Sequence, residues 1–343
     1  MPELPEVETI KNDLKKAILG KKIAGVEVRD KKAVKNSLAD FLKALAGNSF
    51  AGINRIGKLL IFSLKRAAIP PRRDAHTNNN KNEDGKYLLI HLKMTGQLIY
   101  ITPPPPTPSF VRRGNLRIKE RGLNPPMPLA SLKLWRSGPL LKGVDIIAGG
   151  HSFPEAEDHP TKFTRAIFKF ADGATLYFND MRRFGYLKIA DKDELKKIEA
   201  EYGVDPLNKD FKYENLRKIF QNRKITVKQA LMDQKLMAGI GNIYSDEILF
   251  AARVKPTRPV NSLKEAEIKK IFSVIRPILK KAIKHRGTSF SDYVDGQGRR
   301  GNFTSFLKIY GRKAGEKCPV CGGPVRAAKI GGRTAKFCPK CQK

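Results

Sequence analysis

The chain opens with apolar residues at helical spacing and then changes to a strand-like alternation. The recurring apolar positions of the first segment are Val7, Ile10, Leu14 and Ile18. This spacing predicts a helix from the N-terminus to Gly20, since glycine commonly ends a helix. Residues 23–64 and 87–101 alternate apolar and polar side chains in short runs broken by Gly and Asn, which is typical of strands. Residues 174–187 predict another strand, a turn and a strand.

After about residue 188 the pattern becomes helical. Thr226 and Gln229 form a capping-box signal for a helix that we expect to end at the turn 239–241, and Asn242 begins the next helix. A glycine turn before a helix N-terminus offers free N–H groups to an anion such as phosphate. A further helix is predicted from Ser262 to Gly287, with a kink at the proline inside it.

Two segments show neither the helical spacing nor the strand-like alternation of apolar residues. Residues 67–86 are rich in Pro, Arg and Asn, and residues 102–160 hold eleven of the 22 prolines. We interpret both as low-complexity loop insertions that carry many Lys and Arg.

The charge is strongly positive. The 343 residues include 67 Lys and Arg against 33 Asp and Glu, a formal net charge of +34. A nucleic acid is the first partner to expect, and an anionic membrane surface is the alternative. No apolar run of membrane-spanning length and no signal-peptide pattern is present, so we expect a cytoplasmic protein. With 41% hydrophobic residues, the chain can bury two cores, or one large core with appendages.

All four cysteines lie near the C-terminal end, as two CxxC pairs separated by sixteen residues. The four are Cys318, Cys321, Cys338 and Cys341. This spacing indicates a closed tetrahedral zinc site of structural type rather than two disulfides, and four thiolates leave no open position for catalysis. The hairpin between the pairs carries Arg333 and other cations that can face a phosphate.

The residues Pro2 and Glu3 suggest a nucleophile with its own proton donor. Removal of Met1 would leave a secondary amine, and an α-amino group titrates near about 7.7–8.0, so part of it is uncharged at neutral pH. A secondary amine that attacks an aldehyde-level carbon gives an iminium directly. The alternative is that Pro2 only precedes a helix, where proline is favoured.

Five sequence motifs together resemble the formamidopyrimidine-DNA glycosylases of bacterial type. They are, in order, Pro2-Glu-Leu-Pro-Glu-Val-Glu-Thr, His91-Leu-Lys-Met-Thr-Gly, Asn179-Asp-Met-Arg-Arg-Phe-Gly, Asp233-Gln-Lys-Leu-Met-Ala-Gly-Ile-Gly-Asn-Ile-Tyr and the four-cysteine segment. The resemblance covers nearly the whole chain except the two insertions, and five motifs in one order are far more specific than any one alone.

The resemblance implies an α+β protein of three parts. Residues 1–190 would form a β-sandwich catalytic domain with one N-terminal helix, with insertions at about 67–86 and 102–160. Residues 191–312 would form a helix-two-turn-helix domain that binds DNA, and residues 313–343 a zinc finger with a β-hairpin. One structural Zn²⁺ is expected.

The resemblance also implies a bifunctional DNA glycosylase and AP lyase of base-excision repair. Pro2 would attack C1′ of an oxidised purine nucleotide such as 8-oxoguanine or a formamidopyrimidine, and the resulting Schiff base would lead to β,δ-elimination. Glu3 would move protons, and Lys58 would contact a phosphate near the lesion. By the same resemblance, His91, Asn242 and Arg333 would bind the kinked backbone.

Three further residues match the positions that fill the space left by a base turned out of the duplex: Met94, Arg182 and Phe184. Apolar wedges can enter a base stack, and an arginine can reach the orphaned partner base. The neighbouring Arg183 is expected at the same DNA surface. Glu6 and Thr288 are expected near the flipped base, Thr288 at the start of a loop that would close over an oxidised purine.

Two alternatives remain. A related endonuclease VIII-like enzyme would share the amine but prefer oxidised pyrimidines, whereas Leu4-Pro5 and the loop 287–301 favour purines. A non-catalytic zinc-dependent DNA-binding protein would not need Pro2, Glu3 and Lys58 together. We expect a monomer, associated with the nucleoid, whose partner is double-stranded DNA with oxidised bases or abasic sites, and no membrane partner.

Overall fold

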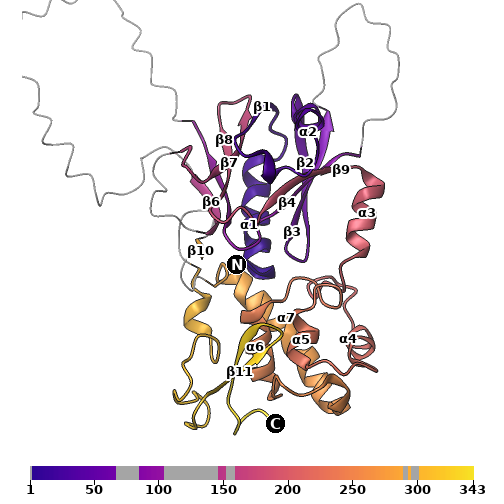
Figure 1. Ribbon diagram of the computed structural model, residues 1–343, viewed down its shortest axis with the longest axis vertical. Helices are drawn as coiled ribbons and strands as arrows, with labels where there is room; N and C mark the ends of the chain where they lie inside the picture. Colours follow the sequence, from indigo (N-terminus) through magenta and orange to yellow (C-terminus); the bar gives the residue numbers. More distant parts are fainter. Residues whose placement is uncertain (1, 67–84, 104–145, 152–158, 289–292, 295–300) are drawn as a thin grey trace, which may run out of the picture.

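The computed structural model describes residues 2–66, 85–103, 159–288 and 301–343, and the backbone alone of residues 146–151 and 293–294. Two bodies lie one above the other in Figure 1: a sheet-rich body around the first helix, and a helical body that also carries a C-terminal hairpin. The insertions were predicted at about 67–86 and 102–160, and most of both lies outside the described residues, namely 67–84, 104–145 and 152–158.

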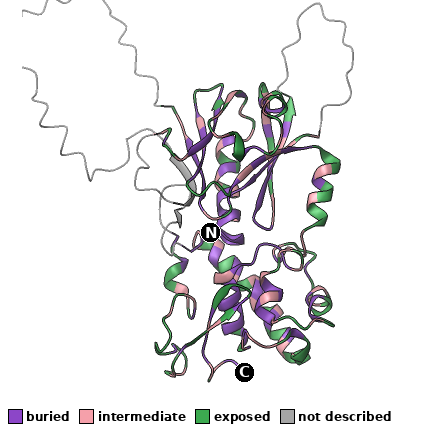
Figure 2. Ribbon diagram, in the orientation of Figure 1, coloured by how far each residue is buried: buried purple, intermediate pink, exposed green. Residues whose placement is uncertain are grey.

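Helix α1 (Leu4–Ile18) confirms the first prediction from the hydrophobic pattern. Its large apolar side chains are fully buried, because the helix packs among the strands rather than on their outer surface (Figure 2). Glu3 precedes it as the N-cap residue, and the Glu3 backbone N–H donates to Glu6 Oε2 at 2.8 Å. The N-terminal segment is therefore fixed by a helix whose other end is anchored in the core.

Two antiparallel sheets enclose this helix. The four-stranded sheet has the order β2-β3-β4-β9 and the six-stranded sheet the order β1-β7-β8-β5-β6-β10. The strands are β1 (Ile23–Val28), β2 (Asn48–Ile56), β3 (Leu59–Arg66), β4 (Tyr87–His91), β5 (Gly96–Ile101), β6 (Ile146–His151), β7 (Thr164–Phe170), β8 (Thr175–Asp180), β9 (Tyr186–Ala190) and β10 (Tyr293–Val294). Phe50 and Phe62 from one sheet and Phe168 and Phe178 from the other belong to one buried cluster. The predicted sandwich is thus present.

The strand and loop predictions need two corrections in this body. Residues 38–45 were expected to be extended but form helix α2 (Leu38–Leu45), which Ser37 caps by accepting the Asp40 N–H. The apolar side chains of α2 recur at helical spacing, and this period prevails over the alternation of the flanking strands. Residues 146–151, expected to be loop, form strand β6 between β5 and β10, and their backbone continues the antiparallel ladder with Ile146 opposite Ile101.

Helix α3 (Lys192–Ala200) follows the sandwich and packs against its four-stranded sheet, where Leu195 joins a cluster with Leu59 and Leu89. The second body contains four helices among the described residues. They are α4 (Tyr213–Phe220), α5 (Val227–Met232), α6 (Asn242–Ala252) and α7 (Glu265–Lys284). The short 3-10 helices of the described chain are η1 (Lys31–Ala33), η3 (Val260–Ser262) and η4 (Phe303–Phe306). Helix α6 is central, with eight of its eleven residues buried, and Leu4 of α1 packs into the same apolar cluster.

Two helix boundaries differ from the prediction. Helix α5 has the expected capping box of Thr226 and Gln229, but it ends at Met232 rather than near residue 239, because Gln234 turns back to hydrogen-bond the loop backbone. Helix α7 begins after Lys264, whose N–H donates to Glu267 Oε2 at 2.7 Å, and Ser262 closes the preceding 3-10 turn. Pro277 lies inside α7, and Gly287 follows its end with φ +82°.

The C-terminal hairpin consists of β11 (Arg326–Ile330) and β12 (Arg333–Phe337). Asp246 of α6 binds this hairpin, because its Oδ2 accepts the Lys336 N–H at 3.1 Å. The neighbouring Glu247 accepts the N–H groups of residues 308–310, which precede the cysteines. The hairpin therefore has a fixed position relative to the start of α6. In the described part of the chain, no helix is long and apolar enough to cross a membrane.

Candidate active site

The Glu3 carboxylate lies at the N-terminus of α6. Its Oε1 accepts the Ile243 N–H at 2.9 Å and its Oε2 the Tyr244 N–H at 3.4 Å, and the residue is only 3% exposed. These N–H groups lack partners within the helix, and the helix dipole favours a negative charge there. The fit depends on Gly241, since a Cβ at this position would lie 2.4 Å from Glu3 Cδ. The buried Pro2 thus lies next to a carboxylate held by the helical body.

Lys58 reaches this region from a two-residue turn between β2 and β3. Gly57 begins the turn with φ +53°, in the left-handed region that glycine adopts without strain. Lys58 is 6% exposed, and burial lowers the pKa of its ammonium. The charges of Arg333 and Lys93 also lower this pKa, whereas the carboxylates of Glu3 and Glu6 raise it. Lys58 therefore lies in the field of both acids and of two other cations.

Glu6 forms a buried polar network behind Glu3. Its Oε1 accepts the Tyr244 hydroxyl at 2.6 Å and the Thr288 N–H at 2.8 Å, and the Tyr244 and Thr288 hydroxyl oxygens are 3.0 Å apart. Burial raises the pKa of Glu6, and the Glu3 carboxylate adds to this shift. Glu6 and Thr288, which were predicted together from the sequence, do lie together.

Met94, Arg182 and Phe184 also form one group. Met94 lies in the turn before β5, and Arg182 and Phe184 lie in the turn between β8 and β9. Arg182 Nη1 is 3.4 Å from Met94 Sδ, and its guanidinium lies over the Phe184 ring at 4.9 Å. Phe184 is 52% exposed. Two exposed or half-buried apolar side chains and an arginine thus project from one edge of the sandwich.

A buried acid that sequence analysis missed holds these two turns together. Asp180 accepts the Thr95 hydroxyl and the Gly185 N–H, and Thr95 in turn accepts the Arg182 N–H at 3.0 Å. Arg183 has φ +58°, and its Nε is 3.6 Å from Asp30 Oδ2. The left-handed backbone at Arg183 places Arg182 and Phe184 on one side of the turn.

His91 ends strand β4 beside the first of these turns. Its Nδ1 accepts the Lys93 N–H at 3.0 Å, and the two rings of His91 and Tyr186 are 5.7 Å apart. Burial, with the charges of Lys93 and Lys58, lowers the pKa of His91 to about 3. Because Nδ1 is an acceptor, the neutral ring carries its proton on Nε2, so His91 is a donor at this atom.

Asn242 and Arg333 lie on the helical side. Asn242 is the first residue of α6, and its buried Oδ1 has no hydrogen-bond partner in the described structure. Arg333 is exposed at the first position of β12. Its positive charge acts to lower the pKa of both Lys58 and Tyr310. The residues predicted as phosphate contacts therefore approach one region from both bodies.

The four cysteines fit a zinc ion. Their Sγ atoms all lie within 4.8 Å of one another, with Cys318 to Cys341 at 3.8 Å and Cys321 to Cys338 at 3.5 Å. A tetrahedron with Zn–S bonds of about 2.3 Å has edges of about 3.8 Å. The surrounding cluster includes only three other buried residues, Phe250, Ile309 and Val325. Bound zinc supplies the folding free energy that so small a core lacks.

Several residues of the site were assigned no role from the sequence, although Tyr244, Gly241 and Asp180 lie within the quoted motifs. Tyr244, Gly241 and Asp180 act through partners more than 80 residues away in sequence or through close packing. Arg55, three residues before Lys58, is buried between the two bodies. Of these, only Gly241 belonged to a local pattern with a physical meaning, the glycine turn before a helix N-terminus.

Comparison with known proteins identifies the family. Family models match residues 1–187 as the formamidopyrimidine-DNA glycosylase N-terminal domain, residues 202–294 as the corresponding H2TH domain, and residues 315–343 as a zinc finger found in FPG and IleRS. Formamidopyrimidine-DNA glycosylases of Pelotomaculum thermopropionicum and Heliobacterium modesticaldum are 32% and 33% identical to the chain. Each alignment covers the whole chain and at least 99% of the relative.

Solved structures agree. The Fpg of Lactococcus lactis in complex with abasic-site DNA has a TM-score of 0.73 and 28% identity, over 99% of each chain. A complex of the same protein with N7-benzyl-Fapy-dG DNA matches with the same score over 100% of each chain. The predicted fold class and the structural zinc are confirmed. The chain belongs to the formamidopyrimidine-DNA glycosylase family, the DNA glycosylases of base-excision repair with AP lyase activity.

Proposed function

We propose that this protein removes oxidised purines from duplex DNA through a Schiff base formed by Pro2. The observation that carries the proposal is the convergence of Pro2, the helix-bound Glu3 carboxylate and the buried Lys58 at the junction of the two bodies. A buried structural proline would need neither the carboxylate nor the ammonium.

The proposed reaction starts after removal of Met1. The Pro2 nitrogen forms a bond to C1′, and the glycosidic bond breaks with its electron pair on the base, which takes up a proton. Loss of the nitrogen proton and opening of the C1′–O4′ bond, with a proton to O4′, give an iminium. Removal of a C2′ proton then expels the 3′ phosphate, and removal of a C4′ proton expels the 5′ phosphate. Glu3 is the group placed to carry these protons.

DNA would be held from both bodies. Lys58, Asn242 and Arg333 are proposed to bind phosphates, and the neutral His91 to donate from Nε2 to a phosphate oxygen. The exposed Phe184, with Met94 and Arg182, would fill the space of the base that is turned out. Arg183, which is also exposed, would contact the same strand segment.

Glu6 and Thr288 are proposed to line the pocket of the flipped base. Their network offers both donors and acceptors, which suits the edge of an oxidised purine. The predicted covering loop lies mostly outside the described residues, but its segment Tyr293–Val294 pairs with β6 of the sandwich. A matching complex of the Lactococcus lactis Fpg holds DNA with an oxidised pyrimidine, so a pyrimidine lesion is the competing substrate for the test below.

We also propose that residues 1–190, 191–312 and 313–343 act as catalytic, DNA-binding and zinc-finger units. The matched family models divide the chain at similar places. All the proposed groups come from one chain, which supports a monomer. Its proposed substrate places this monomer at the DNA of the nucleoid.

The lesion preference is tested with matched duplexes under single-turnover conditions. We expect 8-oxoguanine opposite cytosine, or a formamidopyrimidine, to be released faster than an oxidised thymine in the same sequence. Equal rates, or faster release of the thymine lesion, would favour the endonuclease VIII-like alternative.

A further inference from the structure

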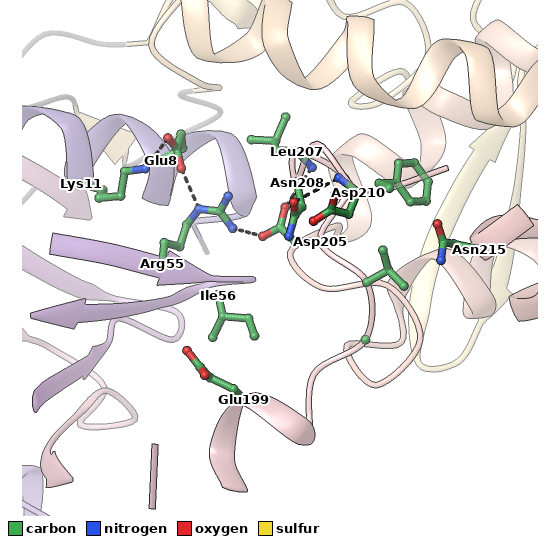
Figure 3. A pocket seen from close by; sticks show the side chains of 13 residues that line it. Glu8, Lys11, Arg55, Ile56, Glu199, Asp205, Leu207, Asn208, Asp210 and Asn215 are labelled. Atoms are coloured by element: carbon green, nitrogen blue, oxygen red, sulfur yellow. Dashed lines mark hydrogen bonds and ion pairs between the residues drawn. The ribbon is translucent and has the colours of Figure 1, made fainter. Parts of the chain in front are cut away.

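A pocket of about 620 Å³ lies at the junction of the two bodies, and Arg55 of β2 forms part of its wall (Figure 3). Its lining comes from α1, from the end of β2 and from residues 199–215. The Arg55 side chain is only 5% exposed. A buried guanidinium in such a place needs a specific arrangement of partners.

Arg55 has three partners, and each belongs to a different segment. Its Nε donates to Glu8 Oε2 at 2.9 Å, and its Nη1 donates to Asp205 Oδ2 at 2.6 Å and to the Gly57 carbonyl at 2.9 Å. Figure 3 shows the guanidinium between the two carboxylates. The two flanking acids outweigh the cost of burial, so the pKa of Arg55 is raised. Glu8, Arg55 and Asp205 are called the triad below.

Each partner is connected to a part of the proposed active site. Glu8 lies on α1, which begins directly after Pro2 and Glu3. Gly57 precedes Lys58 in the same two-residue turn. Asp205 follows Val204, whose carbonyl accepts the Ala238 N–H at 3.0 Å in the loop that leads to α6.

The same three segments touch directly beside the triad. The Leu4 N–H donates to the Gly239 carbonyl at 3.0 Å, which connects α1 to the loop before α6. A Cβ on Gly57 would lie 3.2 Å from the Gly239 nitrogen, so the Lys58 turn presses against that loop. A shift at Arg55 would therefore move Lys58 relative to both Glu3 and the α6 N-terminus.

We propose that Arg55 is a positioning residue for base excision: it fixes the Lys58 turn against α1 and the helical body, and so sets Lys58 relative to Pro2 and Glu3. This inference rests on the proposed function of those three residues. It further follows that a small guanidinium ion can enter the adjoining pocket and replace the missing side chain in a truncated variant.

The test uses the full-length, zinc-loaded protein with its processed N-terminus. Arg55→Ala is compared with wild type for single-turnover release of 8-oxoguanine, where the rate constant reports positioning and the amplitude reports the active fraction. We expect the rate constant to fall roughly 100-fold, the reduction that a misplacement of about 1 Å can cause. The amplitude and the affinity for lesion DNA should stay close to wild type.

Arg258→Ala is the matched control. Arg258 also forms an ion pair with a glutamate, Glu267, but both residues lie within the helical body. Its removal should leave the rate constant unchanged. Guanidinium chloride at tens of millimolar should restore much of the rate of Arg55→Ala, whereas sodium chloride at the same ionic strength should not.

Asp205→Asn keeps the shape of the triad but removes one of its charges. It therefore tests the same interaction even if Arg55→Ala fails to fold. It should slow release less than Arg55→Ala does, and the double variant should be no slower than Arg55→Ala alone, because both changes remove one interaction. The positioning role would be overturned if the two substitutions slowed release independently, so that their effects multiplied in the double variant. A lower amplitude with a normal rate constant in Arg55→Ala would also overturn it. Failure of the wild type to form a borohydride-trapped adduct would instead contradict the Pro2 chemistry, while base release still reports on Arg55.

Discussion

Glu3 shows how a single residue of the proposed site depends on a distant backbone. Its carboxylate is bound by N–H groups 240 and 241 positions later in the sequence, at the start of a helix of the other body. The local sequence identified Glu3 as a proton donor, but this contact was not predictable from it. The absent side chain of Gly241 is what allows the carboxylate to approach.

Gly241→Ala should therefore disturb Glu3 selectively. The new Cβ would lie 2.4 Å from Glu3 Cδ, so the carboxylate must leave the α6 N-terminus. We expect base release to slow roughly 100-fold, as for other misplaced catalytic groups. Single-turnover excision measures the effect, and zinc content and folding should not change.

Gly25→Ala is the control for that substitution. No heavy atom lies within 4 Å of a Cβ at Gly25, and its φ is not positive. Both glycine variants should fold, but only Gly241→Ala should be slow. Wild-type excision by Gly241→Ala would show that Glu3 is not required at the helix terminus.

The buried His91 leads to a second prediction for a single residue, which concerns how folding stability depends on pH. Its ordinary pKa of 6.5 is lowered to about 3 in the folded protein by burial and by the charges of Lys93 and Lys58. Between these values the unfolded chain binds a proton that the folded chain does not, so folding stability falls as the pH is lowered. From pH 7 to pH 5 this decrease should be about 1–2 kcal/mol.

His91→Asn removes this dependence while it keeps an acceptor for the Lys93 N–H. Urea unfolding at pH 7 and pH 5 should show a smaller decrease in stability for the variant than for wild type. An identical decrease in both proteins would mean that His91 is protonated in the folded state.

At the scale of elements, helix α6 connects the proposed site to the zinc hairpin. Its N-terminus binds Glu3, and in its next turn Asp246 pairs with the buried Lys228 and accepts the Lys336 N–H. The sequence predicted the beginning of α6 at Asn242 because the glycine turn is a local signal. Helix α2 and strand β6 were missed because each is a short element within a segment of another pattern.

The zinc hairpin can be tested through one ligand. Cys338→Ser should bind no zinc, leave the sandwich folded and weaken binding to lesion DNA, because the hairpin then lacks its source of folding free energy. Zinc per chain is measured by elemental analysis, and affinity by titration of labelled duplex.

Arg333→Ala separates the charge from the metal. This variant should keep one zinc per chain and still bind DNA more weakly than wild type, with a smaller salt dependence. Absence of zinc from the purified wild type would refute the assignment of the four cysteines.

For the whole molecule, the net charge of +34 indicated nucleic acid, and the order of the motifs indicated the family and the order of its parts. What the sequence could not show is the junction between the bodies. Arg55, Tyr244 and Asp205 look like ordinary residues of a strand, a helix and a loop, and they acquire roles only through contacts across that junction.

Removal of residues 104–145 tests the role of the larger insertion in DNA binding. This segment holds eight Lys and Arg and two acids, and the strands on either side are paired, with Ile101 opposite Ile146. A short glycine-containing turn can join them. We expect excision at low salt to be retained, and the slope of log affinity against log salt to flatten by about 0.9 for each phosphate that the protein no longer neutralises.

Failure of that deletion variant to fold would show instead that the segment belongs to the sandwich. An unchanged salt slope in a folded, active variant would show that its charges do not contact DNA.

The central claim is the covalent role of Pro2, and borohydride trapping tests it most directly. Processed protein incubated with duplex that contains 8-oxoguanine or an abasic site should form an iminium, which borohydride reduces to a stable protein–DNA adduct. Peptide mapping should place the DNA on Pro2. Pro2→Gly should trap more weakly, and protein that retains Met1 should not trap. The absence of any adduct from correctly processed protein on several oxidised purines, or an adduct on a lysine instead, would contradict the account.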